Sequence, residues 1–355
     1  MKEATTADKL VTKLRQLSKQ CVPSAEPLLP LLFRLRGQPY TLQNHFVFEP
    51  LFRVRLPLSL TMKCARQVGK SQSLTSRTII LGATLPHANT LYICPLYEMT
   101  RRTSNNYFKP LIDDSPLRNL LVDSNCNQSV LQRSFLNESN IHFSYALLDA
   151  TRIRGVPSDT VVYDEAQDFD PAVIPIIDET MQGSEKWGFD AASGTPKTFD
   201  TYLQRRWELS SQAEWHIICK ACNKENIPSK EFDLDRMIGP ERVIREISIE
   251  QPGIVCAKCG RPIDPRSGRW VHHRPEYRDE HMGLHVPRII MPAHYSDKIR
   301  WRTILAKRSR LTPAAFYNEV CGESYDYGAK LVTKSELIRA CDNRPNRLDH
   351  AITLK

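Results

Sequence analysis

The sequence has no apolar run that approaches the roughly 18–20 residues needed to span a lipid bilayer. Its longest apolar stretch, Pro27 to Phe33, is short, contains two prolines and leads directly into Arg34 and Arg36. The N-terminal segment places leucines at helical spacing among lysines, without the continuous apolar segment of a secretory signal. We therefore expect no membrane contact, no signal peptide and a protein retained inside the cell, where disulfide bonds are rare.

Internal repeats and low-complexity tracts are also lacking, which excludes a fibrous protein. Apolar residues make up 41% of the chain and charged residues 25%, the proportions of a globular protein, so intrinsic disorder of the whole chain is excluded as well. The 355 residues are enough for one large domain or for two.

Acidic residues are in the minority. The chain has 49 basic and 40 acidic residues, a difference of +9, and a sequence pI of about 9.0. This balance favours a polyanionic partner, most simply nucleic acid, although an excess of this size does not identify one.

Between residues 58 and 193 the chain alternates short β-rich runs with helical ones. Strands separated by helices of this length predict a mostly parallel sheet with helices on both faces, an α/β fold. The expected strands are Leu58–Lys63, Thr90–Pro95, Ser129–Phe135, Asn140–Ala146, Thr160–Tyr163 and Gly188–Ala192, and the expected helices are Lys70–Gly82, Tyr97–Lys109 and Pro171–Gln182.

The two ends of the chain have a different character. Residues 1–40 are helix-like and punctuated by proline, as in an arm. After residue 282 a short β-like pair, Gly283–Val286 and Arg288–Met291, precedes expected helices at Arg300–Arg310, Pro313–Val320 and Lys334–Cys341.

The segment from Cys64 to Ser71 has the pattern of a phosphate-binding P-loop, or Walker A motif. It follows an apolar strand and opens a helix. In such a loop the backbone N–H groups surround the phosphates, Lys70 reaches the β and γ groups, and the Ser71 hydroxyl binds Mg²⁺. Cys64 replaces the first glycine of the strict pattern, and the alternative is a helix that merely begins with lysine. The flanking strand and helix favour the nucleotide site.

A second motif ends the strand Thr160–Tyr163 with two carboxylates, Asp164 and Glu165. In phosphoryl transfer the first such carboxylate, the Walker B aspartate, holds Mg²⁺ and the second polarises the attacking water. An isolated acidic turn would look the same, but the P-loop upstream makes a catalytic pair the better interpretation.

A third motif, Ser193-Gly194-Thr195-Pro196, ends the next β-like run. On a strand beside the P-loop strand, Thr195 would meet the γ-phosphate and sense its loss. A plain β-turn remains the alternative.

These three motifs together resemble the ATPase part of phage terminase large subunits, the DNA-packaging motors. That family lacks the first P-loop glycine and carries an Arg-Gln pair inside the loop, as Arg66 and Gln67 do here. The resemblance implies a P-loop ATPase fold of the RecA or ASCE type, and ATP hydrolysis coupled to translocation of double-stranded DNA into a procapsid.

The resemblance also assigns roles. It makes Arg66 a cis-acting arginine, Glu165 the water-activating base, and Ser193, Gly194 and Thr195 the coupling motif. Lys70 would contact the phosphates, and Ser71 and Asp164 would hold Mg²⁺. The ATP-binding set is Arg66, Gln67, Val68, Gly69, Lys70 and Ser71, with Gln43 as the candidate for the family's adenine-contacting glutamine.

Arg152 and Arg154 precede the second motif. They could serve a neighbouring subunit, and a DNA contact or a structural role is an equal alternative. An arginine acting in trans would require an oligomer.

Four cysteines form two Cys-x₂-Cys knuckles, Cys219/Cys222 and Cys256/Cys259. Two such knuckles supply four thiolates to one Zn²⁺, so a structural zinc ribbon is expected, with an inserted excursion between the knuckles. A redox pair is the rival interpretation, and His272 and His273 are alternative ligands. The ribbon could present its basic side chains to DNA, or these side chains could simply face water. They are Lys220, Lys224, Lys258 and Arg261.

A zinc ribbon after the ATPase motifs resembles the zinc-bearing branch of terminase large subunits. This resemblance runs from about residue 40 to residue 341 and implies a homo-oligomeric ring, portal and small-terminase partners, and a place in the host-cell cytoplasm. The expected parts are an arm (1–40), the ATPase domain (41–213), the zinc ribbon (214–275) and a small C-terminal α/β linker region (276–355).

A basic cluster surrounds Trp301 on an expected helix. Such a face could neutralise DNA phosphates without reading sequence, and a solvated charged surface is the alternative. Its candidate DNA contacts are Lys298, Arg300, Arg302, Lys307 and Arg308.

Terminase large subunits usually continue into a nuclease domain, and only 14 residues follow Cys341 here. We therefore expect no nuclease activity from this chain. Two other functions stay open: a helicase or remodelling ATPase, which generally needs a second RecA-like domain, and a DNA-binding module with a vestigial P-loop.

Overall fold

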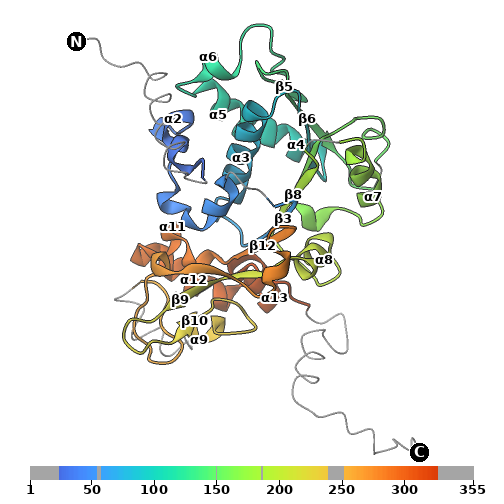
Figure 1. Cartoon of the computed structure of the whole chain (residues 1–355). Helices are drawn as coiled ribbons and strands as arrows, with labels where there is room; N and C mark the ends of the chain where they lie inside the picture. The colour runs from blue at the N-terminus through green and yellow to red at the C-terminus, as the bar shows by residue number, and fades with distance from the viewer. Residues whose placement is uncertain (1–23, 54–56, 149, 185–186, 239–251, 327–355) are drawn as a thin grey trace, which may run out of the picture.

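One large mixed sheet forms the centre of the molecule (Figure 1). The computed structural model describes residues 24–53, 57–148, 150–184, 187–238 and 252–326. The strand order of the sheet is β10-β9-β12-β3-β8-β7-β4-β6-β5, and β11 pairs with β9 beside this path. The strands are β3 (Ser59–Cys64), β4 (Asn89–Cys94), β5 (Gln132–Ser134), β6 (Asn140–Tyr145), β7 (Thr160–Asp164), β8 (Phe189–Gly194), β9 (Ala213–Ile218), β10 (Glu225–Asn226), β11 (Arg269–His272) and β12 (His281–Val286).

The centre of the sheet is parallel and covered on both faces. The pairs β3–β8, β7–β8, β4–β7, β4–β6 and β3–β12 are all parallel. Side chains alternate between two cores: Met62, Tyr92 and Val162 belong to one, and Ile93 and Tyr163 to the other. Near-continuous apolar strands are required because each face is buried, and this explains why the sequence pattern identified them.

The helices fill the spaces between these strands. The main ones are α3 (Lys70–Thr84), α4 (Tyr97–Thr103), which continues through the π-helical turn η4 (Ser104–Phe108) into α5 (Lys109–Asp113), α7 (Ile174–Asp178) and α8 (Tyr202–Leu209). The C-terminal part contributes α11 (Pro292–Tyr295), α12 (Lys298–Arg310), α13 (Pro313–Phe316) and the π-helical turn η10 (Tyr317–Cys321). Shorter pieces are η1 (Glu26–Leu28), α2 (Leu29–Leu32), η2 (Leu42–Asn44), η3 (Phe46–Phe52), α6 (Arg118–Leu121), η5 (Ala166–Asp168), η6 (Glu179–Met181), α9 (Leu234–Ile238), η7 (Pro265–Ser267), η8 (Pro275–Tyr277) and η9 (Arg288–Ile290), with the two-stranded ribbon β1 (Arg34–Leu35) and β2 (Gln38–Pro39).

The strand β12 adds a feature that the sequence did not predict. It pairs with β3 along its full length, from His281 opposite Ser59 to Val286 opposite Cys64, and it also touches β9. The C-terminal part of the chain therefore completes the sheet beside the P-loop strand, in the lower half of Figure 1.

The expected strand at Arg288–Met291 is wrong. Pro287, which has no N–H to donate, ends β12, and the next residues form the 3-10 turn η9, closed by the Met291 N–H on the Arg288 carbonyl at 3.1 Å. The partners of β12 are β3 and β9 rather than a following strand.

The predicted α/β class and its mostly parallel sheet are confirmed. The six strands expected between residues 58 and 193 all occur with small shifts at their ends. The expected helix Lys334–Cys341 and the helical start of the arm lie outside the described residues. Within the described part of the chain, no helix is long and apolar enough to cross a membrane.

Candidate functional site

The P-loop connects the end of β3 to the start of α3. Gln67 and Gly69 both have left-handed backbone conformations, with φ of 61° and 88°. α3 begins at Lys70 without a side-chain cap, so its first N–H groups are left for a ligand. A Cβ at Gly69 would lie 2.5 Å from His45 Nε2, so glycine is required there on two grounds.

Cys64, which replaces the expected glycine, is the last residue of β3. Its side chain is fully buried, and burial raises the pKa of its thiol to about 12. Because the tight turn begins only after this residue, the position does not need glycine. Cys64 is a packing residue rather than a phosphate ligand.

The three motifs found in the sequence meet at one ammonium group. β8 lies between β3 and β7, so the carboxyl ends of all three strands are neighbours. Lys70 Nζ donates to Thr195 Oγ1 at 3.0 Å and lies 3.2 Å from Glu165 Oε1. The P-loop lysine, the second carboxylate and the coupling threonine thus form one cluster.

Asp164 is buried and bonded, as a metal-holding carboxylate is. Its Oδ2 accepts a hydrogen bond of 2.9 Å from the Tyr92 hydroxyl, and its Oδ1 accepts one of 3.1 Å from the Glu165 N–H. Burial and the adjacent Glu165 charge raise the pKa of Asp164 to about 6. A nearby cation would offset this cost, which fits a divalent metal ligand.

Glu165 has the opposite electrostatic environment. Burial would raise the pKa of Glu165, but the Lys70 ammonium and the Gln167 amide outweigh it, so its pKa lies below the usual value. The backbone of Glu165 is left-handed, with φ of 55°, a conformation that costs a non-glycine residue free energy and is often found at functional sites.

Gln167 connects Glu165 with the coupling motif, a role that the sequence did not reveal. Its amide donates to Glu165 Oε2 at 2.8 Å, and its carbonyl accepts the Thr195 N–H at 3.0 Å. Gly194 makes this possible, because a Cβ there would lie 2.2 Å from the Gln167 carbonyl oxygen. Ser193, next to it, is fully buried at the end of β8.

Two cavities meet at this cluster, one of about 660 Å³ and one of about 720 Å³. They share Arg66, Ser71, Tyr107, Glu165 and Glu319. Arg66 forms an ion pair with Glu319 at 3.1 Å, so the expected cis-acting arginine is held by the C-terminal part of the chain. The smaller cavity is also lined by His45, Gln67, Gly69, Lys70, Gln72, Arg288 and Lys307.

The other candidate residues, two proposed for ATP binding and two for a neighbouring subunit, differ in their burial. Val68 is buried beneath the loop. Gln43 is exposed on η2 and is not among the described residues that line either cavity, whereas His45 from the same region is. Arg152 and Arg154 are exposed on the turns before β7. The roles of Gln43 and of these two arginines stay predictions.

The C-terminal segment contacts the coupling motif directly. The Asn318 amide donates to the carbonyl oxygens of Pro196 at 2.8 Å and Lys197 at 2.7 Å, and the Tyr325 N–H also donates to the Lys197 carbonyl at 2.8 Å. A change at Thr195 therefore has a short covalent and hydrogen-bonded path to residues 318–325.

A buried ionic network joins the same segment to the sheet. Lys63 Nζ lies 2.7 Å from Glu323 Oε2, and His285 Nδ1 lies 2.7 Å from Glu214 Oε2. His285 Nε2 faces the Cys321 carbonyl at 2.9 Å and Glu323 at 3.7 Å. Although Glu214, His285 and Glu323 cluster as metal ligands do, Lys63 and a protonated His285, whose two ring nitrogens both face oxygen atoms, together balance the two carboxylates, so we interpret the group as structural.

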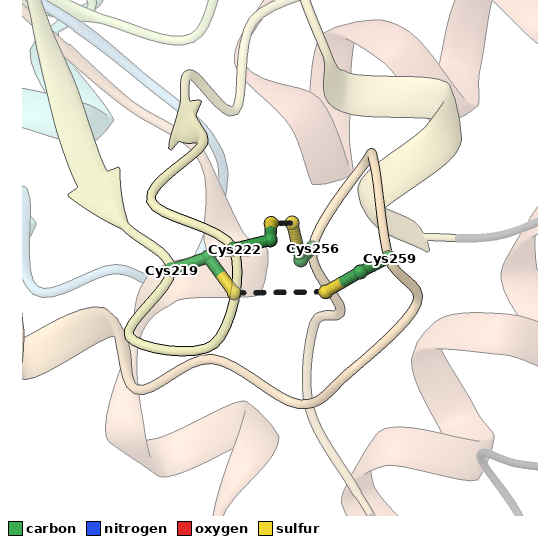
Figure 2. Close-up of side chains that lie close together, drawn as sticks. All are labelled: Cys219, Cys222, Cys256 and Cys259. Atoms are coloured by element: carbon green, nitrogen blue, oxygen red, sulfur yellow. Dashed lines mark hydrogen bonds between the residues drawn. The ribbon is translucent and has the colours of Figure 1, made fainter.

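The four knuckle cysteines converge as predicted (Figure 2). Cys219 Sγ lies 3.7 Å from Cys259 Sγ, and Cys222 Sγ lies 3.6 Å from Cys256 Sγ. A tetrahedral zinc site with Zn–S bonds of about 2.3 Å places its sulfurs about 3.8 Å apart. All four cysteines are free thiols, and the Lys258 N–H donates to Cys256 Sγ at 3.4 Å, so the residues fit Zn²⁺.

The alternative zinc ligands lie elsewhere. His272 Nδ1 pairs with Ser211 Oγ at 2.8 Å, and His273 stacks on Phe232. Of the basic residues of the ribbon, Lys224 forms an ion pair with Asp233 at 3.1 Å, whereas Lys220, Lys258 and Arg261 are exposed.

The candidate DNA-binding residues of α12 fall into two groups, one exposed and one partly buried. Lys298, Arg300 and Arg302 are exposed. Lys307 lines the P-loop cavity, and Arg308 lies 3.6 Å from Asp235. Trp301 and Ile304 bury the remaining side.

A loop with the P-loop pattern, two carboxylates and a threonine meet at the carboxyl edge of a parallel sheet, which is the arrangement of a P-loop ATPase fold. The family described as phage terminase large subunit gpA, ATPase domain, matches residues 55–274, more than half of the chain, and the chain belongs to this family. No curated protein matches the sequence.

Two solved structures agree with the fold. A mutant and an unmutated form of the large terminase ATPase domain of Thermus phage P74-26 are both 13% identical to this chain. They have TM-scores of 0.51 and 0.50, cover 85% of this chain, and are themselves covered to 99% and 98%. The HK97 bacteriophage large terminase is 14% identical with a TM-score of 0.41, covering 51% of this chain and 39% of that one.

Proposed function

We propose that this chain is the ATP-hydrolysing motor subunit of a viral DNA-packaging terminase, which couples hydrolysis to movement of double-stranded DNA into a procapsid. Family membership supports the ATPase class. The observation that carries the mechanism is the convergence of Thr195 and Glu165 on the Lys70 ammonium.

The P-loop residues bind the phosphates of ATP. The N–H groups that open α3 and the side chain of Lys70 face the nucleotide, and Arg66 contributes a second cation. Ser71 and Asp164 hold Mg²⁺, which neutralises phosphate charge when bound.

Glu165 orients and deprotonates the attacking water. In this structure Lys70 lies against Glu165. When phosphate oxygens take over the ammonium, Glu165 loses this ion pair and becomes available to water, with Gln167 still fixing its carboxylate. Binding of ATP therefore switches the base on.

Thr195 senses the phosphate that Lys70 binds. Because Asn318 and Tyr325 hydrogen-bond the residues that follow Thr195, loss of the γ-phosphate is transmitted into the C-terminal part of the chain. Ser193 and Gly194 form the rest of this coupling motif.

The partners follow from this function. Double-stranded DNA, a homo-oligomeric ring of this subunit, and portal and small-terminase proteins are proposed, with the host-cell cytoplasm as the place of action. The exposed basic residues of α12, chiefly Lys298, Arg300 and Arg302, are proposed to contact DNA phosphates. Nuclease activity is not part of the proposed function.

The cysteine quartet is proposed to bind one structural Zn²⁺. Its thiols brace the loop after β9 against the loop before β11, on the far side of β12 from the P-loop strand. The proposed functional parts are the arm, the ATPase domain, the zinc ribbon and the C-terminal linker. The last three are not separate folding units, because β9 and β12 share one sheet with the P-loop strand.

A helicase is the weaker alternative. Such enzymes generally work with two RecA-like domains, and the described residues contain one large sheet, into which the strands after Gly194 are incorporated.

ATP hydrolysis by the purified protein tests the proposal. Glu165→Gln should reduce turnover by at least about 100-fold while nucleotide binding persists, because the change removes the base and keeps the shape. Glu179→Gln, on an exposed 3-10 turn, is the matched control and should leave turnover unchanged. Turnover that survives Glu165→Gln would refute the assignment of the base.

Movement of DNA requires a separate assay. With the partner proteins of the virus, the wild type should package intact duplex and Glu165→Gln should not. Strand separation without movement of intact duplex would instead favour the helicase.

A further inference from the structure

Two cations from the C-terminal part of the chain face the P-loop. Arg288, in η9, and Lys307, in α12, line the same cavity as Lys70 and Ser71. Neither residue belongs to any of the three ATPase motifs, and the sequence pattern around Lys307 predicts a DNA contact instead.

Arg288 is buried without adequate partners. Its side chain is 7% exposed, and its Nε has no hydrogen-bond partner among the described residues. A buried guanidinium normally has its donors satisfied, because an unpaired buried charge costs several kcal/mol. An open cavity beside such a group suggests that a ligand supplies the missing acceptor.

The charge balance of the cavity is positive. Its lining includes four cations, Arg66, Lys70, Arg288 and Lys307, and two carboxylates, Glu165 and Glu319. Lys70 pairs with Glu165, and Arg66 pairs with Glu319. Arg288 and Lys307 are therefore left without a carboxylate of their own within the described part of the cavity.

The surroundings of both groups support an anionic ligand. Burial lowers the pKa of Arg288, although Glu319 opposes the shift. Burial lowers the pKa of Lys307, and the charges of Arg288 and Arg66 lower it further, with Glu319 again opposing. These cations crowd one another, and a phosphate group between them would relieve the repulsion.

His294 connects the C-terminal helices to the P-loop. Its Nε2 lies 2.9 Å from the Gln67 carbonyl oxygen, so the start of the C-terminal helices is attached to the P-loop itself. Arg288 and Lys307 flank this contact along the chain.

We propose that Arg288 and Lys307 bind the phosphate groups of a nucleoside triphosphate in the same subunit as the P-loop. This inference rests on the proposed ATPase function. In this arrangement η9 and α12 form one wall of the nucleotide site, and the phosphates connect them to the P-loop. Loss of the terminal phosphate then weakens the attachment of α12 to the P-loop.

The geometry also connects nucleotide and DNA. Lys307 lies on the cavity side of α12, and Lys298 and Arg302 are exposed on the same helix. A shift of α12 upon loss of phosphate contacts would move its exposed basic residues directly.

Nucleotide binding without turnover tests the inference. Affinity for the Mg²⁺ complex of ATPγS, for ADP and for adenosine is measured by calorimetry on the full chain. Arg288→Ala and Lys307→Ala should each weaken ATPγS binding by about tenfold or more, the effect of losing a charge-assisted contact, and leave adenosine binding unchanged. Arg278→Ala and Lys109→Ala, changes of the same types at exposed positions that line neither cavity, should leave all three unchanged.

The outcomes separate the two proposals. If Lys70→Ala also leaves ATPγS binding unchanged, the proposed ATPase function fails. If Lys70→Ala abolishes binding but Lys307→Ala and Arg288→Ala bind as the wild type does, only the further inference fails. Equal loss of adenosine binding would indicate a structural role and overturn it as well. Lys307 is partly exposed, so its variant decides the matter even if Arg288→Ala does not fold.

Discussion

The side-chain carbonyl of Gln167 accepts a hydrogen bond of 3.0 Å from the backbone N–H of Thr195. The same amide group donates to Glu165, so one side chain touches both the proposed base and the coupling motif. A movement of the loop after β8 would therefore act on the side chain that holds the Glu165 carboxylate.

Gln167→Ala should lower kcat for ATP by about 10- to 100-fold, the effect of losing a charge-assisted hydrogen bond, with little change in KM. Steady-state ATPase kinetics measure both parameters. Gln182→Ala, on an exposed turn, is the matched control. A rise in KM with unchanged kcat would show instead that Gln167 acts in nucleotide binding.

The exposed face of α12 should bind duplex DNA through its phosphates. Lys298→Gln and Arg302→Gln should each weaken binding equally for duplexes of unrelated sequence and reduce the salt dependence of log K by about 1. Fluorescence anisotropy over a series of salt concentrations gives both quantities. Lys109→Gln is the control, and an unchanged salt dependence in both variants would remove α12 from the DNA interface.

The cysteine quartet should carry about one zinc per chain. Cys259→Ser, which changes an exposed ligand, should weaken zinc affinity by at least about 100-fold, more than the loss of an outer-shell contact does. Metal analysis and titration of thiols before and after chelation measure this. Cys126→Ser, outside the quartet, should retain the metal, and a wild type without metal but with four reactive thiols would contradict the prediction.

His285 should make stability depend on pH. Burial lowers its pKa, but Glu214 and Glu323 outweigh burial, with Lys63 opposing them, so the pKa in the folded protein lies above the usual value. The stabilisation from protonated His285 is therefore complete below the unfolded pKa of about 6.5 and is lost as the pH rises through the folded value.

The unfolding temperatures of the wild type and His285→Gln should consequently differ most near about pH 6 and converge at higher pH. Thermal unfolding across this range measures the difference. His87→Gln, at an exposed position, should show no such convergence. A difference that grows with pH would mean that His285 is buried as the neutral form.

Local patterns were enough to predict much of the site. Lys70, Asp164, Glu165 and Thr195 each end or begin a regular element, and the order of strands in a parallel sheet brings such ends together. The convergence of the four cysteines was predictable for the same reason, because each Cys-x₂-Cys segment is a local turn that carries two thiols.

The remaining site residues depend on contacts between distant parts of the chain. Tyr92 reaches Asp164 from a neighbouring strand, and Glu319 pairs with Arg66 across 253 positions. Neither contact leaves a spacing pattern in the sequence. Lys307 looked like its basic neighbours because the charges on a helix do not show which side faces a cavity.

The pairing of β12 with β3 has a consequence for how the protein folds. Ser59 of β3 pairs with His281 of β12, more than 200 residues later in the chain. The β12 side of the P-loop strand therefore stays an open sheet edge until β12 has been synthesised. Until then its backbone N–H and C=O groups on that side are open to pairing with other chains. Such a high-contact-order pairing predicts slow maturation and a need for protection of the nascent chain.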